Sequence, residues 1–144
     1  MRIWHYRLLP YLPDAQFKGQ LRELVAILRD WRDKGHTNHI LINKVMEYPK
    51  GHLYRYFLEY AVEYQNRNDE QLPKCFSEFQ AWKDPASFLS APYPGWHDKA
   101  YLRVCMANLY EKHVYGRGKS RITDEEWQRI LEGYQVITGE TYQI

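Results

Sequence analysis

Large apolar residues recur at helical spacing between Pro13 and Gly35, and this pattern constrains the fold more than any other. Counted along the chain, the intervals are four, three, four and three residues: Phe17, Leu21, Leu24, Leu28 and Trp31. On a helical wheel the later four lie within about 40° of the first, which makes one apolar stripe. The pattern predicts an amphipathic helix that Asp14 caps and Lys34-Gly35 ends, and other parts of the chain have to cover its apolar stripe.

The remaining segments carry further helix signals, and none keeps the alternation of a strand. Thr123 and Glu126 form a capping box that opens a last helix. Pro10 and Pro13 disfavour helical geometry in the residues before them, so residues 1–13 are predicted to form an extended arm. Further helices are expected over residues 38–47, 52–65, 75–82, 86–89, 97–111 and 123–135. Since 144 residues suit one domain, the prediction is an all-α fold, a single compact helical domain with an extended N-terminal arm.

Composition narrows the class of protein. The mean hydropathy of -0.70 and the lack of an apolar run near 20 residues argue against a membrane-spanning helix. No secretory signal pattern opens the chain, and Cys75 and Cys105 suit reduced thiols better than a disulfide framework. We therefore expect a cytoplasmic, nucleoid-associated protein that does not bind membranes.

Charge and aromatic content leave two interpretations open. Residues 99–121 hold six basic residues and one acid, whereas residues 123–144 hold five acids and one base. This asymmetry favours a phosphate-facing side, although charge runs are also typical of solvated faces. Aromatic residues make up 16% of the chain, which fits either an aromatic core or rings that stack on bases. The net charge of +2 does not by itself indicate a nucleic-acid partner.

The two flanks of the first predicted helix differ in charge. Arg22 and Arg29 lie on one flank of the apolar stripe, while Glu23 lies on the other, between Gly19 and Ala26 one turn away. A carboxylate between such small residues can be approached closely by a substrate or by another backbone. Alternatively, the acid simply faces solvent and the small residues allow close helix packing.

Four short motifs follow one another in the order found in a known family. The stretch from Leu12 to Leu24 resembles the first helix of the phage pyrimidine-dimer DNA glycosylases. The opening Met1-Arg2-Ile3, the pair Gly51-His52, and the late segment Ala107-x-Leu109-x-Glu111-Lys112 with Tyr115-Gly116 resemble further family motifs. The resemblance touches residues 1–116 and leaves the predicted helix 123–135 as an addition.

The resemblance implies a DNA repair glycosylase with an associated AP lyase activity. In that family the N-terminal α-amine attacks C1′ of the sugar, a Schiff base forms, and a carboxylate assists strand cleavage. An α-amine has a pKa of about 7.7–8.0, so part of it is neutral at pH 7. Carried over by position, the catalytic residues are Met1 and Glu23, and the DNA-binding residues are Arg2, Arg22 and Lys112.

Other residues are candidates for the same surface. Arg117, Lys119 and Arg121 form a basic loop suited to a phosphate backbone. His52 either lines the DNA groove or packs on Tyr rings where its helix begins. No cofactor or metal is expected, because no ligand cluster stands out. The expected partner is damaged double-stranded DNA, carrying pyrimidine dimers or related base lesions, bound by a monomer.

Departures from the family pattern keep alternatives open. Arg2 follows Met1, so the initiating Met should stay and supply the amine. Ala26 and Asn108 stand where the family has arginines, which weakens the expected attraction for phosphate. A non-enzymatic DNA-binding module of the same fold would fit these losses. A protein-interaction domain using the aromatic helix over residues 52–65 is the third hypothesis.

Overall fold

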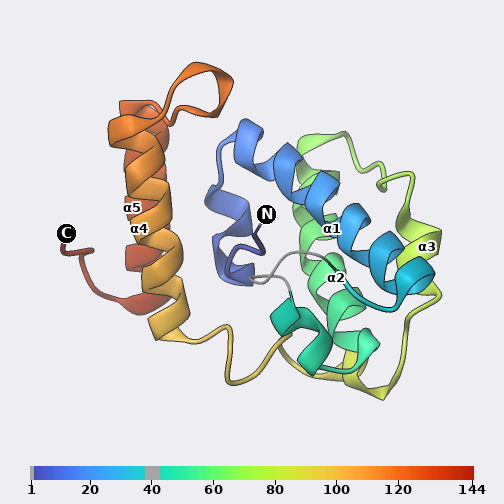
Figure 1. The fold of residues 1–144 in the computed structure, drawn as a ribbon. Coiled ribbons are helices and arrows are strands. Elements are labelled where there is room, and N and C mark those ends of the chain that lie inside the picture. The colour runs from blue at the N-terminus through green and yellow to red at the C-terminus, as the bar shows by residue number, and fades with distance from the viewer. Residues whose placement is uncertain (1, 38–42) are drawn as a thin grey trace.

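The computed structural model describes residues 2–37 and 43–144, and every regular element in these ranges is a helix. Figure 1 shows α4 and α5 side by side, the N-terminal segment in the middle, and α1 beside α2 on the opposite side of the molecule. The predicted all-α class is confirmed. The α-helices are α1 (Asp14–Lys34), α2 (Lys50–Arg67), α3 (Phe76–Gln80), α4 (Lys99–Tyr115) and α5 (Asp124–Thr138). The 3-10 helices are η1 (Tyr6–Tyr11), η2 (Asn43–Glu47), η3 (Pro85–Phe88) and η4 (Gly118–Ser120).

Helix α1 has the bounds that its apolar stripe predicts. Phe17, Leu24 and Leu28 are buried, and Gly35 ends the helix in the left-handed conformation with φ of 77°. That conformation is accessible to glycine without steric cost, which explains the sharp stop. Asp14 is the first helical residue rather than a cap, and it pairs with Arg67.

The prediction of an extended arm over residues 1–13 is wrong for its second half. Residues 6–11 form the 3-10 helix η1 with Pro10 inside it, and Leu8 and Leu9 are buried. Proline removes only one donor from so short a helix, and η1 packs against both α2 and α5. Burial of two leucines between helices therefore outweighs the local preference for extended backbone.

The middle of the chain is close to expectation with one exception. Where a helix was predicted over residues 38–47, the described part is the 3-10 helix η2, and residues 38–42 lie outside the described residues. The short helices α3 and η3 occur where helices were expected. The His52–Gln65 prediction is confirmed by the slightly longer α2.

The aromatic face of α2 is part of the core. Tyr56, Phe57 and Tyr60 are each at most 1% exposed. Phe57 stacks on Phe79 of α3, and Phe17 of α1 stacks on Tyr60. These rings already have partners within the chain, so the hypothesis of an interaction domain built on this aromatic face is wrong.

Helix α5 closes the N-terminal segment from the side opposite α2. The Thr123 and Glu126 capping box forms as predicted, and Trp127, Ile130 and Tyr134 are buried. One core cluster joins buried residues of all five α-helices and of the N-terminal segment, which makes one domain of the described residues. The limit of family similarity near residue 116 stays a prediction.

The described helices also bear on the membrane prediction. Over residues 2–37 and 43–144, no helix has the length and apolar character that crossing a bilayer requires.

Candidate active site beside the N-terminal segment

The Glu23 side chain lies beside the N-terminal segment. The amide nitrogen of Arg2 donates a hydrogen bond of 2.9 Å to Oε2 of Glu23, across 21 residues of sequence. Glu23 is half-buried on α1, and Arg2 is half-buried too. The guanidinium of Arg2 lies over the ring of Trp4, 5.2 Å from its centroid. Met1, the predicted nucleophile, lies outside the described residues.

Gln20, one turn before Glu23 on α1, hydrogen-bonds to the backbone of Arg2 and Trp4. Its Nε2 donates to the carbonyl oxygen of Arg2 at 2.9 Å, and its Oε1 accepts from the amide of Trp4 at 2.8 Å. Tyr56 of α2 donates its hydroxyl proton toward the Trp4 carbonyl at 2.7 Å and lies 3.1 Å from Oε1 of Gln20. Gln20 is 1% exposed, so this amide is a buried partner for a backbone that has no strand neighbour.

Side chains of α4 and of the segment before it also form hydrogen bonds with the N-terminal backbone. Tyr101 donates its hydroxyl to the carbonyl of Ile3. The amide of His5 donates to Sγ of Cys105 at 3.4 Å, and the amide of Tyr6 donates to Nδ1 of His97 at 3.2 Å. The backbone of residues 2–6 is thus held by side chains from α1, α2, α4 and the segment before α4.

Burial keeps these holding groups neutral near pH 7. It raises the pKa of the Tyr56 and Tyr101 hydroxyls, and it raises the pKa of Cys105 to about 11. Burial also lowers the pKa of His5 to about 4, and that of His97 well below its usual value. None of the five carries a charge that would compete with Glu23.

Glu23 opens into a pocket of about 230 Å³. The lining residues are Arg2, Trp4, Ala15, Gln16, Gly19, Gln20, Glu23, Lys112 and Ser120. The pocket therefore brings together three residues that were predicted to act together: Arg2 of the N-terminal segment, Glu23 of α1 and Lys112 of α4. Gly19 supplies a wall without a side chain, which fits the expectation that small residues leave the carboxylate accessible.

Arg22 lies at the edge of this pocket. A Cβ built on Gly19 would be 3.6 Å from Nη2 of Arg22. Arg22 also lines a second cavity of about 430 Å³, together with Lys18, Tyr64 and others. The predicted DNA-binding arginine, which is exposed, therefore lies between two hollows on the same helix.

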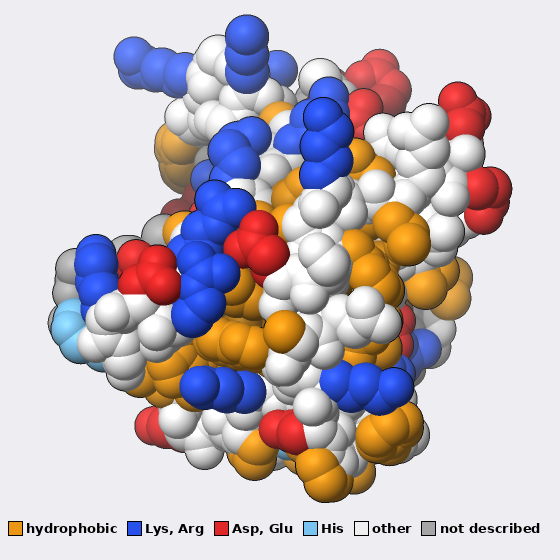
Figure 2. Space-filling model, turned by 90° about the vertical axis from the view of Figure 1, so that its right-hand side faces the viewer, with side chains coloured by type: hydrophobic (Ala, Val, Ile, Leu, Met, Phe, Trp, Pro, Cys, Tyr) orange, Lys and Arg blue, Asp and Glu red, His pale blue; other side chains and the backbone are white. Residues whose placement is uncertain are grey.

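The basic loop docks beside the start of α1. Arg117, Lys119 and Arg121 are exposed, and Nε2 of Gln16 donates to the carbonyl of Ser120 at 2.8 Å. Ile122 is buried behind the loop, and its amide donates to the Lys112 carbonyl at 3.3 Å. Figure 2 shows Lys and Arg side chains gathered over the upper and left parts of one face of the molecule.

His52 packs on an aromatic ring where its helix begins, as one of its two interpretations predicted. It is 5% exposed at the start of α2, its Nδ1 accepts from the amide of Tyr93 at 3.1 Å, and its ring stacks on Tyr93. It is absent from the lining of the Glu23 pocket. Its assignment to a DNA groove stays a prediction without support from this geometry.

Sequence reasoning missed four residues of this site, Gln16, Gln20, Tyr56 and Tyr101. A signal existed for the two glutamines, since they precede Glu23 by seven and three residues and so share its flank of α1. Polar residues beside a buried stripe are candidates for a specific backbone contact. The tyrosines have no comparable signal, because thirteen tyrosines are spread along the chain.

In this helical protein a half-buried carboxylate lies beside an anchored N-terminal segment and is bordered by cations. Such a site suits an anionic substrate. Comparison with protein families gives a specific answer. The model of the pyrimidine dimer DNA glycosylase family matches residues 1–76, and the chain belongs to this enzyme family. The match covers Glu23, Gln20 and Tyr56 but ends before α4. Among curated proteins and solved structures, no match was found.

The family is one of enzymes, the pyrimidine dimer DNA glycosylases, and damaged DNA is the substrate that the family implies. The predicted similarity over Ala107–Gly116 lies beyond the matched residues and stays a prediction.

Proposed function

We propose that this protein removes pyrimidine dimers or related lesions as a DNA glycosylase with AP lyase activity. In this proposal the α-amine of Met1 is the nucleophile, Glu23 is the catalytic carboxylate, and the protein acts as a monomer without a cofactor. The observation that carries the proposal is the hydrogen bond of 2.9 Å between the Arg2 amide and Glu23. Three covalent bonds separate the α-nitrogen of residue 1 from that amide nitrogen in any peptide, so the carboxylate is near the amine's attachment point.

The chemistry needs only these two groups and a bound sugar. The neutral amine forms a bond to C1′ while the bond between C1′ and the damaged base breaks, with the electron pair leaving on the base. The amine attached to C1′ loses a proton and its lone pair forms C=N, while the C1′–O4′ bond breaks with the electron pair and a proton going to O4′, which leaves a protonated Schiff base. Removal of a C2′ proton then expels the 3′ phosphate and nicks the strand. A carboxylate beside C1′ stabilises the positive charge and moves protons.

The surrounding cations suit a phosphate backbone. Arg2 and Lys112 line the pocket with Glu23, while Arg22 and the loop Arg117–Arg121 lie around it. Such side chains position a duplex without reading its sequence. The losses at Ala26 and Asn108 leave these positions as the main cationic contacts of the proposal.

Borohydride trapping with an abasic duplex tests this function. We expect a covalent adduct that maps to the N-terminal peptide, disappears after N-terminal acetylation and falls strongly in Glu23→Gln. Asp30→Asn, a half-buried acid two turns further along α1 that pairs with Lys34, is the matched control and should trap normally.

Two results would contradict the proposal. Full trapping by the acetylated protein would exclude the N-terminal amine. Salt-dependent duplex binding without any adduct would mean that the fold binds DNA and lacks the chemistry.

A further inference from the structure

The amide of Gln20 links the N-terminal backbone to the carboxylate. Its Nε2 lies 2.9 Å from the Arg2 carbonyl and 3.4 Å from Oε2 of Glu23, while its Oε1 accepts from Trp4. Glu23 in turn accepts from the Arg2 amide. One buried side chain thus contacts both Glu23 and the backbone of Arg2, the residue next to the proposed nucleophile.

The orientation of this amide has one solution. Rotation by 180° would place its NH2 group against the Trp4 amide donor, and its oxygen against the Arg2 carbonyl and Glu23. Donor would face donor and acceptor would face acceptor, at a site that is 1% exposed. Oε1 also lies 3.1 Å from the Tyr56 hydroxyl and can share its single proton with the Trp4 carbonyl.

We propose that Gln20 is a positioning residue, which sets the distance and direction of the N-terminal amine relative to Glu23, with Tyr56 holding Gln20 in place. This inference rests on the proposed amine mechanism. Gln20 takes no part in bond making. Its role is to keep residues 2–4 at one register along α1, because reacting groups lose rate steeply when they are misplaced.

Three substitutions separate a positioning role of Gln20 from a general effect on folding. Gln20→Leu keeps the volume and removes every hydrogen bond of the amide. Tyr56→Phe removes one hydroxyl. Tyr60→Phe is its matched control, because Tyr60 lies one turn later on α2, is 1% exposed, and donates to the Phe17 carbonyl inside α1 at 2.8 Å.

The readout is the single-turnover rate of borohydride trapping at saturating abasic duplex, beside the affinity for that duplex from gel shift. Gln20→Leu should lower the trapping rate by about a hundredfold and leave affinity unchanged, because only the reacting geometry is disturbed. Tyr56→Phe should lower it by about tenfold. Tyr60→Phe should trap at the wild-type rate, although both Tyr variants lose one buried, hydrogen-bonded hydroxyl.

The pH profile gives a second readout that loss of folding would not produce. Gln20→Glu places a second carboxylate beside Glu23 and the Arg2 backbone. Added negative charge near an amine favours its protonated form and so raises the pKa of the amine. The trapping profile of Gln20→Glu should therefore move to higher pH, whereas a purely structural defect lowers the rate equally at every pH.

Three outcomes would overturn the inference. Gln20→Leu trapping at the wild-type rate would leave the proposed function intact and remove the positioning role. Equal loss of rate in Tyr56→Phe and Tyr60→Phe would show a general effect on the fold, and this comparison decides if Gln20→Leu does not fold. Wild-type protein that binds the duplex and never traps would refute the proposed function, and the positioning role with it.

Discussion

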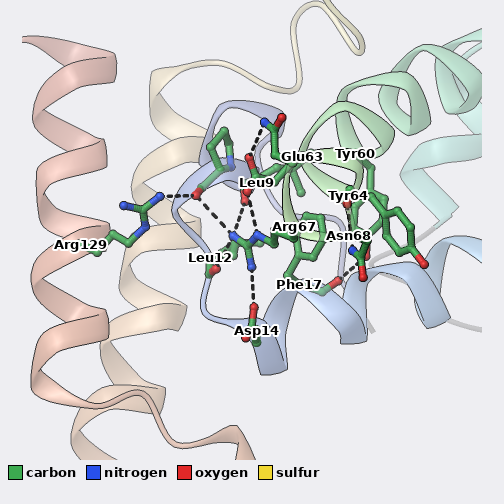
Figure 3. Close-up of polar contacts among 12 residues, drawn as sticks. Leu9, Leu12, Asp14, Phe17, Tyr60, Glu63, Tyr64, Arg67, Asn68 and Arg129 are labelled. Carbon is green, nitrogen blue, oxygen red and sulfur yellow. Dashed lines mark hydrogen bonds and ion pairs between the residues drawn. The ribbon is translucent and has the colours of Figure 1, made fainter. Parts of the chain in front are cut away.

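Arg67, near the end of α2, has partners on several sides of the N-terminal segment. Figure 3 shows its guanidinium among the carbonyls of Leu9 and Leu12 and the carboxylates of Asp14 and Glu63. The shortest contacts are 2.7 Å to Glu63 and 2.8 Å to the Leu12 carbonyl, and the group lies 4.2 Å from the Phe17 ring centroid. Arg67 therefore fixes the turn that joins η1 to α1.

The planar fork of Arg67 predicts that lysine cannot replace it. Arg67→Lys keeps the charge but cannot reach acids and carbonyls on several sides at once. We expect the free energy of unfolding to fall by about 2 kcal/mol, measured by urea denaturation. Arg29→Lys, at an exposed ion pair with Glu78, should leave it nearly unchanged. Equal effects at the two positions would contradict this account.

Buried His5, His52 and His97 make stability depend on pH, because burial lowers the pKa of each. Burial lowers the pKa of His5 to about 4 in the folded protein, below about 6.5 in the unfolded chain. Between these values the unfolded state binds more protons, so stability is complete above pH 6.5 and is lost as the pH falls toward 4. His97, whose pKa is also lowered by burial, acts in the same direction.

We expect the free energy of unfolding to fall by about 1 kcal/mol or more per pH unit between pH 6 and 5. Urea denaturation across this range measures it. In His5→Asn the shorter amide still accepts from the Arg7 amide and does not titrate, so the dependence should be shallower. An unchanged slope in this variant would show that His5 is not responsible.

At the scale of elements, α5 packs on η1, which also packs on α2. Gly133 permits this contact, because a Cβ built there would overlap the ring of Tyr11. Arg129 adds a hydrogen bond of 3.0 Å to the Pro10 carbonyl, visible in Figure 3. The last helix, which lies beyond the residues matched to the family, thus packs directly on the N-terminal segment.

Gly133→Ala should separate these two elements. Although alanine favours helix, its methyl group would overlap the Tyr11 ring, so the free energy of unfolding should fall by about 1–3 kcal/mol. Tyr11→Ala in the same chain should relieve the clash, and a double-mutant cycle by thermal unfolding should show strong coupling. Additive effects would mean that Gly133 and Tyr11 do not set the contact.

On the scale of the whole molecule, segments far apart in sequence surround one pocket. Lys112 of α4 reaches the Glu23 pocket, and the exposed loop Arg117–Arg121 is fastened to α1 through Gln16. Lys112 and the loop after α4, the later part of the positive segment noted in the sequence, therefore lie beside the candidate site, whereas Lys99 and Arg103 contact the C-terminal region.

Replacing Arg117, Lys119 and Arg121 with alanine should weaken duplex binding in a salt-dependent way. Each lost phosphate contact lowers the slope of log affinity against log salt by about 0.9, so three contacts lower it by roughly 2–3. Gel shifts at several salt concentrations measure this slope. Trapping at saturating DNA should be retained, and a variant that keeps the wild-type slope would remove the loop from the DNA-binding surface.

The sequence alone identified the structural features that depend on residues close together in the chain. The periodic stripe, the Gly35 stop and the Thr123 capping box located α1 and α5, because helix signals act within a few residues. Glu23 could be singled out because its small neighbours are one turn away on the same helix. The resemblance in the first residues and the first helix agreed with the family match over residues 1–76.

Only the tertiary structure decided how the N-terminal segment is held. Its 3-10 helix forms between α2 and α5, against the local preference that Pro10 and Pro13 indicate. Gln20 contacts residues 16 to 18 positions away in the sequence, and Tyr56 reaches Trp4 across 52 positions. A buried polar group pairs with whichever backbone the packing of distant helices brings to it, and no local pattern carries that information.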